Sequence, residues 1–175
     1  MIRIIWIFGS IGGVILVLSL ALTMTLSTHG GAIGMIVGYL SMLVALSVVF
    51  VGVKRYRDIE LGGAIAFWTA LYLGLGIAFV SSLFYVFGWE VYMYMTDYRF
   101  MDEYIKSYLV QKQSEGLAAA QLSKISAELY GFKQQYANLW FRLLTSLSEI
   151  APIVILVALV SAALLRKSNF MPARR

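Results

Sequence analysis

The residues best suited to chemistry are two acids and an arginine that stand within or beside long apolar runs of the sequence. Glu149 lies 16 residues before Leu165, the end of its run, so a helix places it about 24 Å from that end. A carboxylate inside a membrane span is costly, usually faces the bundle interior and is by default a functional candidate. Arg142 lies two turns earlier on the same helical face, and Glu90 lies at the end of another apolar run. Glu90, Arg142 and Glu149 are therefore the candidate intramembrane polar cluster.

Three interpretations of this cluster are open. It is an ion pair that locks helices together, a proton or solute relay, or a site where Arg142 binds an outer-leaflet lipid headgroup. Pro152 predicts a helix kink beside the acid, because its ring leaves the carbonyl of Ser148 without a helical N–H partner. Such a bend, or an intervening water, is the route by which Arg142 could neutralise Glu149.

Motifs for catalysis, metal binding or cofactor binding are absent from the sequence. There is no cysteine. The single histidine, His29, excludes an HExxH motif and supplies only one imidazole ligand for a metal site. No GxGxxG or phosphate-binding loop follows a strand pattern, and no Ser-His-Asp set is suggested. A weak anion-site candidate is a helix start at Gly62–Gly63, near Arg55. We expect no enzyme, no cofactor and no metal.

The composition indicates a membrane protein. Of the 175 residues, 61% are hydrophobic and 13% are charged, whereas soluble domains carry about 25% charge. Apolar runs long enough to cross a bilayer predict four spans, at about residues 4–26, 32–53, 61–86 and 140–165. A signal peptide is the alternative for the first run, which is longer than a signal's apolar region. The predicted fold class is all-α, an integral membrane bundle of four transmembrane helices forming a single domain over residues 1–175.

Small residues recur at four-residue intervals in the second and third spans. This spacing lets helix backbones approach closely in lipid, where apolar burial does not drive association. The residues that we expect to pack helices in this way are Gly34, Gly38, Gly62, Ala66, Ala70 and Gly74. We expect contacts within one bundle, with the second and third spans as antiparallel neighbours. A homodimer face is the alternative for the second span.

Residues 96–138 form the one sizeable polar segment. Their apolar residues repeat at helical spacing on both sides of Gly116, which predicts two amphipathic helices. The two helices would fold onto each other or onto the membrane surface. The charges in this segment nearly cancel and fit a solvated face, and the segment is too small for an independent enzyme domain.

The basic residues predict the orientation. In a four-span bundle, the basic residues that fall on one side of the membrane are Arg3, Lys54, Arg55, Arg57, Arg166 and Lys167. The positive-inside rule therefore places both termini in the cytoplasm and residues 96–138 on the extracytoplasmic side. The net charge of +5 is explained by this distribution and does not indicate a nucleic-acid partner.

Three stretches carry a family resemblance. They are SMLVALSVVFVGVKRYRD at 41–58, GGAIAFWTALYLGLGIAFVSSLFYV at 62–86 and SEIAPIVILVALVSAALLRK at 148–167. Together with the helical segment that ends in QQYAN and precedes the third stretch, they resemble the bacterial membrane-protein family catalogued as domain of unknown function 4199. The resemblance implies an integral four-helix protein of the bacterial inner membrane and brings no established activity, cofactor or substrate. Family members often have Pro-Val-Gly-Leu after the acid, whereas here Ile153 and Val154 follow Pro152.

These observations favour a non-enzymatic structural or accessory subunit. We expect it to contact the lipid bilayer and to bind a membrane or envelope partner through residues 96–138, or to form a homo-oligomer. The alternative is a small oligomeric channel or a proton-coupled transporter that uses Glu149. Four spans are few for a monomeric transporter, and these spans lack the polar lining that a pathway needs.

Overall fold

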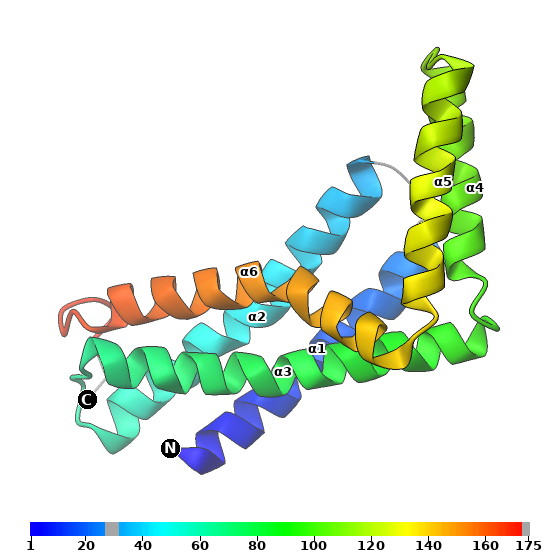
Figure 1. The fold of residues 1–175 in the computed structure, drawn as a ribbon. Helices are drawn as coiled ribbons and strands as arrows, with labels where there is room; N and C mark the ends of the chain where they lie inside the picture. Colours follow the sequence, from blue (N-terminus) through cyan, green and yellow to red (C-terminus); the bar gives the residue numbers. More distant parts are fainter. Residues whose placement is uncertain (27–31, 173–175) are drawn as a thin grey trace.

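The computed structural model describes residues 1–26 and 32–172, apart from the side chains of a few residues on either side of the gap. His29 and the surroundings of Gly34 therefore lie outside the described residues. The described part of the chain contains six helices and no strand (Figure 1). The helices are α1 (Ile2–Leu26), α2 (Ala32–Glu60), α3 (Phe67–Met95), α4 (Phe100–Ser114), α5 (Ala119–Tyr136) and α6 (Leu139–Leu165).

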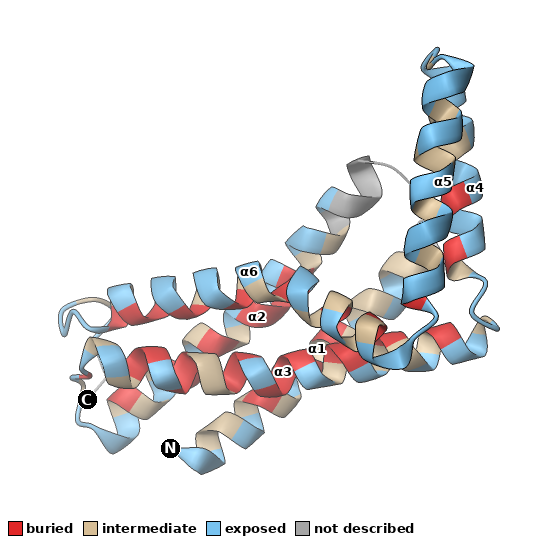
Figure 2. Ribbon diagram, in the orientation of Figure 1, coloured by how far each residue is buried: buried red, intermediate tan, exposed pale blue. Residues whose placement is uncertain are grey.

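Four of these helices, α1, α2, α3 and α6, are long and apolar enough to cross a membrane. This confirms the predicted all-α class and the four predicted spans. The central helix is α3, which is the most buried of the four and packs mainly against α1 and α6 (Figure 2). The predicted pairing of the second and third spans is present but is a smaller contact. The helices α1, α2 and α6 leave large apolar faces exposed, as expected where lipid is the solvent.

The third helix begins at Phe67, later than the sequence predicted. Gly62 and Gly63 have φ values of +67° and +101°, a conformation that glycine adopts without strain. The N–H of Gly63 donates to the carbonyl of Arg57 at 2.9 Å and closes the end of α2. Ala66 is extended and precedes the first turn of α3. The prediction that Gly62 and Ala66 pack helices was wrong, as was that of a helix start at Gly62–Gly63, because these residues form the turn.

The remaining part of the small-residue repeat does pack helices. Ala70 and Gly74 lie on the buried face of α3. A Cβ added at Gly74 would lie 3.4 Å from the Cβ of Ala158 on α6 and 3.5 Å from Val49 on α2. Gly38 differs, because a Cβ added there would meet no atom of the described residues within 4 Å. The prediction that Gly38 packs helices within the bundle was therefore wrong.

The α1 and α3 helices make the most extensive contact in the described bundle, and a glycine within it gives a testable pair of variants. A Cβ added at Gly9 would lie 2.6 Å from the Cβ of Val80 and 3.1 Å from the carbonyl oxygen of Ile77. We expect Gly9→Ala to lower the free energy of unfolding by about 1–3 kcal/mol, because the two helices must move apart. Gly38→Ala should be neutral or stabilising, since alanine is the better helix former. Thermal unfolding of both variants in mild detergent tests this, and equal losses would contradict the packing.

The helices α4 and α5 form the hairpin that the polar segment predicted. Gly116, with a φ of +82°, lies in the turn between them. The N-terminus and the end of α6 lie at the end of the bundle that holds the α2–α3 turn, and the hairpin stands at the opposite end, crosswise to α3 (Figure 1). Most hairpin residues are exposed (Figure 2). The α3 helix runs on to Met95, beyond the predicted span end at residue 86, so it carries the hairpin on a continuous support.

Candidate functional site

A buried ion pair joins α3 to α6 at the hairpin end of the bundle. Arg142 is 4% exposed and makes a two-pronged contact with Glu90. Its Nε donates to Oε1 and its Nη2 donates to Oε2, both at 2.7 Å. Paired N–H···O bonds of this kind are among the strongest and most directional in proteins. Two of the three residues of the predicted polar cluster therefore meet.

The same guanidinium also connects the bundle to the base of the hairpin. Its Nη1 donates to the carbonyl of Tyr136, the last residue of α5, at 3.0 Å. The ring of Tyr98 lies 5.1 Å from the guanidinium carbon, within cation–π range. Tyr98 has a φ of +57°, a conformation that bulky residues rarely adopt. This turn after α3 places the tyrosine over the arginine, and Arg142 thereby connects its own helix, α6, to α3, α5 and the turn.

Glu149 lies outside this ion-pair network. It accepts a hydrogen bond from the buried Tyr85 hydroxyl at 3.4 Å, and it forms no ion pair with any residue that the structure describes. Its side chain is exposed on the surface of the bundle. Arg142 forms no ion pair with Glu149, which the sequence had left as a possibility, because Glu90 and a backbone carbonyl accept from the guanidinium instead. Headgroup binding by Arg142 is likewise unsupported, since its charge is buried and paired.

The α6 helix continues through Pro152 without interruption. In Figure 1 the part of α6 nearest the hairpin turns away from the line of the rest of the helix, as the predicted kink requires. Asn138 caps the start of α6, where its side chain accepts from the N–H of Phe141 at 3.2 Å. The cap and the proline together set the direction in which α6 carries Arg142 and Glu149.

Aromatic residues fix the hairpin on α3. The indole N–H of Trp89 donates to the hydroxyl of Tyr136 at 2.7 Å, and the Trp89 ring meets Phe100 edge-on at 4.8 Å. Burial raises the pKa of the Tyr136 phenol, so the hydroxyl stays protonated at neutral pH. Along α4, Phe100, Tyr104 and Tyr108 form a stacked series with centroid spacings of 6.2 and 6.0 Å. Sequence reasoning missed this series, although its four-residue spacing was a visible signal.

At the opposite end of the bundle, Arg57 is 0% exposed. Its Nε donates to Asp58 Oδ1 at 2.7 Å. The Nη1 and Nη2 groups donate to the carbonyls of Phe170 and Met171 at 2.9 and 2.6 Å. Arg57 therefore holds the segment after α6 against α2, a role that its position in a basic cluster did not reveal. By contrast, Arg55, Arg166 and Lys167 are exposed, and Lys54 pairs with Asp58 at 2.5 Å.

The α2 helix extends beyond the predicted end of the second span and carries these basic residues. The α2 helix runs on to Glu60, so Lys54, Arg55 and Arg57 lie on its last turns and not in the connecting turn. Cations near a helix C-terminus are favourable. Their end of the bundle is also that of the N-terminus (Figure 1).

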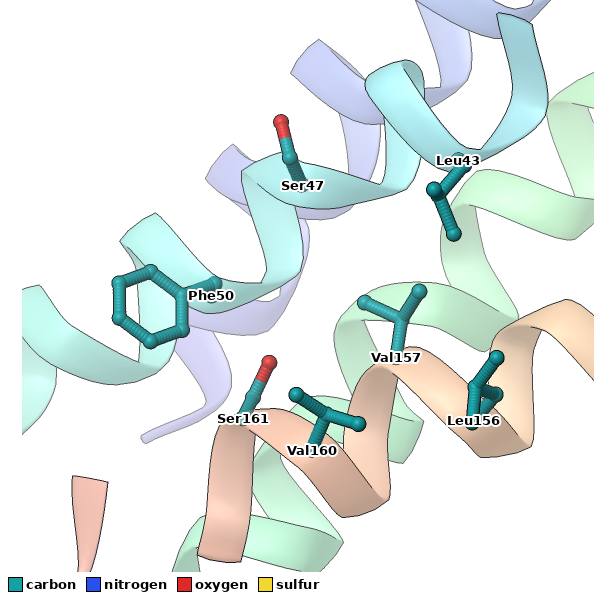
Figure 3. Close-up of a pocket in the computed structure, with 7 residues that line it drawn as sticks. All are labelled: Leu43, Ser47, Phe50, Leu156, Val157, Val160 and Ser161. Atoms are coloured by element: carbon teal, nitrogen blue, oxygen red, sulfur yellow. The ribbon is translucent and has the colours of Figure 1, made fainter. Parts of the chain in front are cut away.

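An apolar groove of about 260 Å³ lies between α2 and α6 (Figure 3). Its lining residues come from these two helices and are Leu43, Ser47, Phe50, Leu156, Val157, Val160 and Ser161. A second apolar hollow of about 270 Å³ lies against Ser19, Leu40, Ser41 and Val44. Among the described residues, no three His, Cys, Asp or Glu side chains are grouped so as to hold a metal ion. The groove and Glu149 are the features that could contact a ligand.

The fold and this site define the class of protein. It is a helical bundle with four candidate membrane spans and a two-helix hairpin that is fixed to the bundle at its base. The family model described as "Protein of unknown function (DUF4199)" matches residues 7–167. The chain therefore belongs to this family, and the resemblance carried by the three sequence stretches is confirmed. Neither a curated protein nor a solved structure matches the chain.

Proposed function

We propose that this is a non-enzymatic accessory protein of a membrane, which binds a membrane or envelope protein through the α4–α5 hairpin. The observation that carries the proposal is the combination of a rigid base with an exposed length. At the base, the Arg142–Glu90 ion pair and the Trp89–Tyr136 hydrogen bond fix the hairpin to α3 and α6. Beyond the base, the hairpin contacts little else in the described chain.

The exposed faces of the hairpin are suited to a protein surface. Large apolar side chains exposed along it are Tyr104, Val110, Tyr130 and Phe132. These side chains offer apolar contact area on an otherwise polar hairpin. Charges of both signs surround them, including the Lys112–Glu115 and Lys133–Asp102 pairs. A preorganised hairpin of this kind loses less conformational freedom on binding than a flexible segment does.

The proposed location is the bacterial inner membrane, which the family resemblance suggests, with both termini in the cytoplasm. The basic residues at the end of the bundle opposite the hairpin support this orientation. In this arrangement the hairpin lies on the extracytoplasmic side. There it can reach a periplasmic domain or the loops of a neighbouring membrane protein.

The proposed function is tested by photo-crosslinking in intact membranes. A photoreactive amino acid at Val110 or Tyr130, which are 60% and 49% exposed, should capture the same protein. The matched control carries the probe at Arg55, which is exposed at the opposite end of the bundle. We expect capture from both hairpin positions and none from the control. Capture only from the control position, or no protein captured from the hairpin, would overturn the proposal.

The transporter alternative is separated from this proposal by a flux measurement. In proteoliposomes, an accessory protein should show no proton flux that depends on Glu149. The structure gives the alternative little support, because Glu149 does not join the Arg142–Glu90 pair and the two hollows are apolar. A proton flux that Glu149→Gln abolishes in a folded protein would favour the transporter.

A further inference from the structure

The hairpin leaves the bundle at the level where exposed aromatic residues mark a lipid headgroup layer. Tryptophan and tyrosine on the surface of membrane proteins concentrate at these layers. On α3, the exposed Trp68 and Tyr94 are 26 residues apart, which corresponds to about 39 Å of helix. A bilayer measures roughly 40–45 Å across, headgroups included. Tyr94 and the exposed Trp140, the second residue of α6, therefore place the base of the hairpin in the headgroup layer of its side.

The direction of the hairpin is along this layer. Figure 1 shows α4 and α5 crosswise to α3, with the turn between them as the part of the hairpin farthest from α3. With α3 across the membrane, an element crosswise to it lies parallel to the membrane surface. The 18 residues of α5 extend about 27 Å in this direction. The hairpin therefore reaches sideways past α3 and α6, over the lipids that surround the bundle.

One face of the hairpin continues the surface on which its base rests. The stacked series of α4 begins at α3, where Phe100 meets Trp89 edge-on at 4.8 Å, and it continues along α4 through Tyr104. On α5, Phe132 meets Phe141 of α6 with ring centroids 5.7 Å apart. The face that contacts the bundle at the base thus carries aromatic side chains beyond it. In a crosswise hairpin this face is directed toward the membrane.

The other exposed apolar residues of the hairpin lie on the opposite face. Successive residues of a helix turn by about 100°, so residues two positions apart point in nearly opposite directions. Val110 follows Tyr108 by two residues, and Tyr130 precedes Phe132 by two. Both Val110 and Tyr130 are exposed. The hairpin therefore has an aromatic face directed toward the membrane and a second face directed away from it.

The aromatic face suits lipid headgroups without help from charge. A tyrosine side chain has an apolar ring and a polar hydroxyl, a combination that is stable at the boundary between lipid and water. Residues 96–138 contain five basic and five acidic side chains, so the segment has no net charge to attract anionic lipid. Lys112, which lies over the ring of Tyr108 at 5.6 Å, is paired with Glu115. Burial of aromatic surface is therefore the driving force expected for lipid contact.

From these observations we propose that the α4–α5 hairpin lies flat on the headgroup layer of the membrane and contacts phospholipid through the face of Tyr104, Tyr108 and Phe132. The opposite face, with Val110 and Tyr130, stays in water, where a protein can reach it. The lipid contact needs no protein partner, so a failure of this proposal and a failure of the proposed function are separate results.

Spin labels near the tip of the hairpin test this orientation. The chain has no cysteine, so a single introduced cysteine carries one nitroxide label. Gln121 is 11 residues from Phe132, about three turns, and shares its face. Ser123, two residues further on, is the matched control on the opposite face, and both residues are exposed. The full-length protein is reconstituted into phosphatidylcholine vesicles. Collisions of the label with oxygen, which enters lipid, are compared with collisions with a water-soluble nickel chelate.

We expect the ratio of oxygen to nickel collisions to be at least about threefold higher in Gln121→Cys than in Ser123→Cys. Equal, water-like ratios would overturn the proposal, because a hairpin that projects from the membrane keeps residue 121 about 20 Å from the headgroups. A label in Gln121→Cys that is shielded from both reagents would also overturn it. In these vesicles such shielding means that a second copy of the chain, and not lipid, covers the aromatic face.

Two further substitutions in the labelled Gln121→Cys protein test whether the aromatic face causes the contact. Tyr108→Ser should lower the collision ratio about twofold, while Val110→Ser, on the opposite face, should leave it unchanged. Circular dichroism checks that the helices persist in both variants. Equal effects of the two substitutions would contradict the proposal. The ratio should also be the same in vesicles that contain phosphatidylglycerol and at high salt. A contact seen only with anionic lipid and lost in salt would show that charge, and not the aromatic face, holds the hairpin there, against the proposal.

Discussion

Replacing Arg57 by alanine is expected to lower the free energy of unfolding by about 2–4 kcal/mol and to release the segment that follows α6. Arg57 is 0% exposed, and its guanidinium binds Asp58 and the carbonyls of Phe170 and Met171. Alanine leaves the carbonyls of Phe170 and Met171 without the donors that Arg57 supplies, and leaves a void under the tail, whereas Asp58 keeps its pair with Lys54. Hydrogen bonds that involve a charged group are worth more than neutral ones, so this is among the largest single-residue effects expected for the chain.

Arg55→Ala is the matched control for Arg57→Ala. It removes the same charge from the same cluster, two residues away, but Arg55 is exposed. We expect a change of less than about 0.5 kcal/mol, as for surface substitutions in general. Limited trypsin digestion reads out the tail directly, because Arg166 and Lys167 should be cut faster only when Arg57 is replaced. Equal digestion and equal thermal unfolding of the two variants would show that Arg57 does not hold the tail.

The contrast between the exposed Arg55 and the buried Arg57 is a feature that the sequence alone does not predict. Both residues belong to a cluster that predicts orientation, and the positive-inside rule treats them alike. Which of the two is buried depends on the face of α2 that meets the tail, a contact between residues more than 100 positions apart. The packing of Phe50 edge-on against Phe170, with centroids 6.5 Å apart, belongs to the same long-range contact. No local pattern reports such a contact.

The four spans and the hairpin, by contrast, were predictable, because each has a local physical cause. Bilayer thickness sets the length of an apolar helix, and apolar residues at helical spacing set the face of an amphipathic one. Local spacing failed at Gly62, which continues the four-residue repeat of small residues but occupies a turn. The spacing of small residues indicates which of them could share a helix face. Whether a glycine such as Gly62 adopts a positive φ depends instead on where the helix ends.

The polar cluster was predictable in its members but not in its pairing. Glu90, Arg142 and Glu149 all stand out as charges beside or within apolar runs. Arg142 lies seven residues from Glu149 on one helix, yet it pairs with Glu90 across 52 residues of chain. Arg142 pairs with Glu90 because α3 packs against α6 at this level. The carbonyl of Tyr136 accepts a further hydrogen bond from the same guanidinium. Glu149 is consequently left on the surface, where it becomes available to a ligand.

The second large effect is expected from breaking the Arg142–Glu90 pair. Arg142→Met should lower the free energy of unfolding by about 3–5 kcal/mol, because it leaves the Glu90 side chain, which is 20% exposed, without its cation. Glu90→Gln should cost less, because the amide oxygen still accepts one of the two bonds from Arg142, although the charge and the second bond are lost. The control is Arg99→Ala, which removes an arginine paired with Asp97 at the exposed surface and should cost about 0.2–1 kcal/mol.

A double-mutant cycle decides whether the pair acts as a unit. If Arg142 destabilises chiefly by leaving Glu90 unpaired, then Arg142→Met combined with Glu90→Leu should be less damaging than Arg142→Met alone. Thermal unfolding in detergent measures the whole protein, and proteolysis within α4 and α5 measures the hairpin separately. Because Arg142 also binds the carbonyl of Tyr136, the double variant should still loosen the hairpin base. Additive losses for the two substitutions would mean that Arg142 and Glu90 are not coupled, and that the ion pair does not connect α3 and α6.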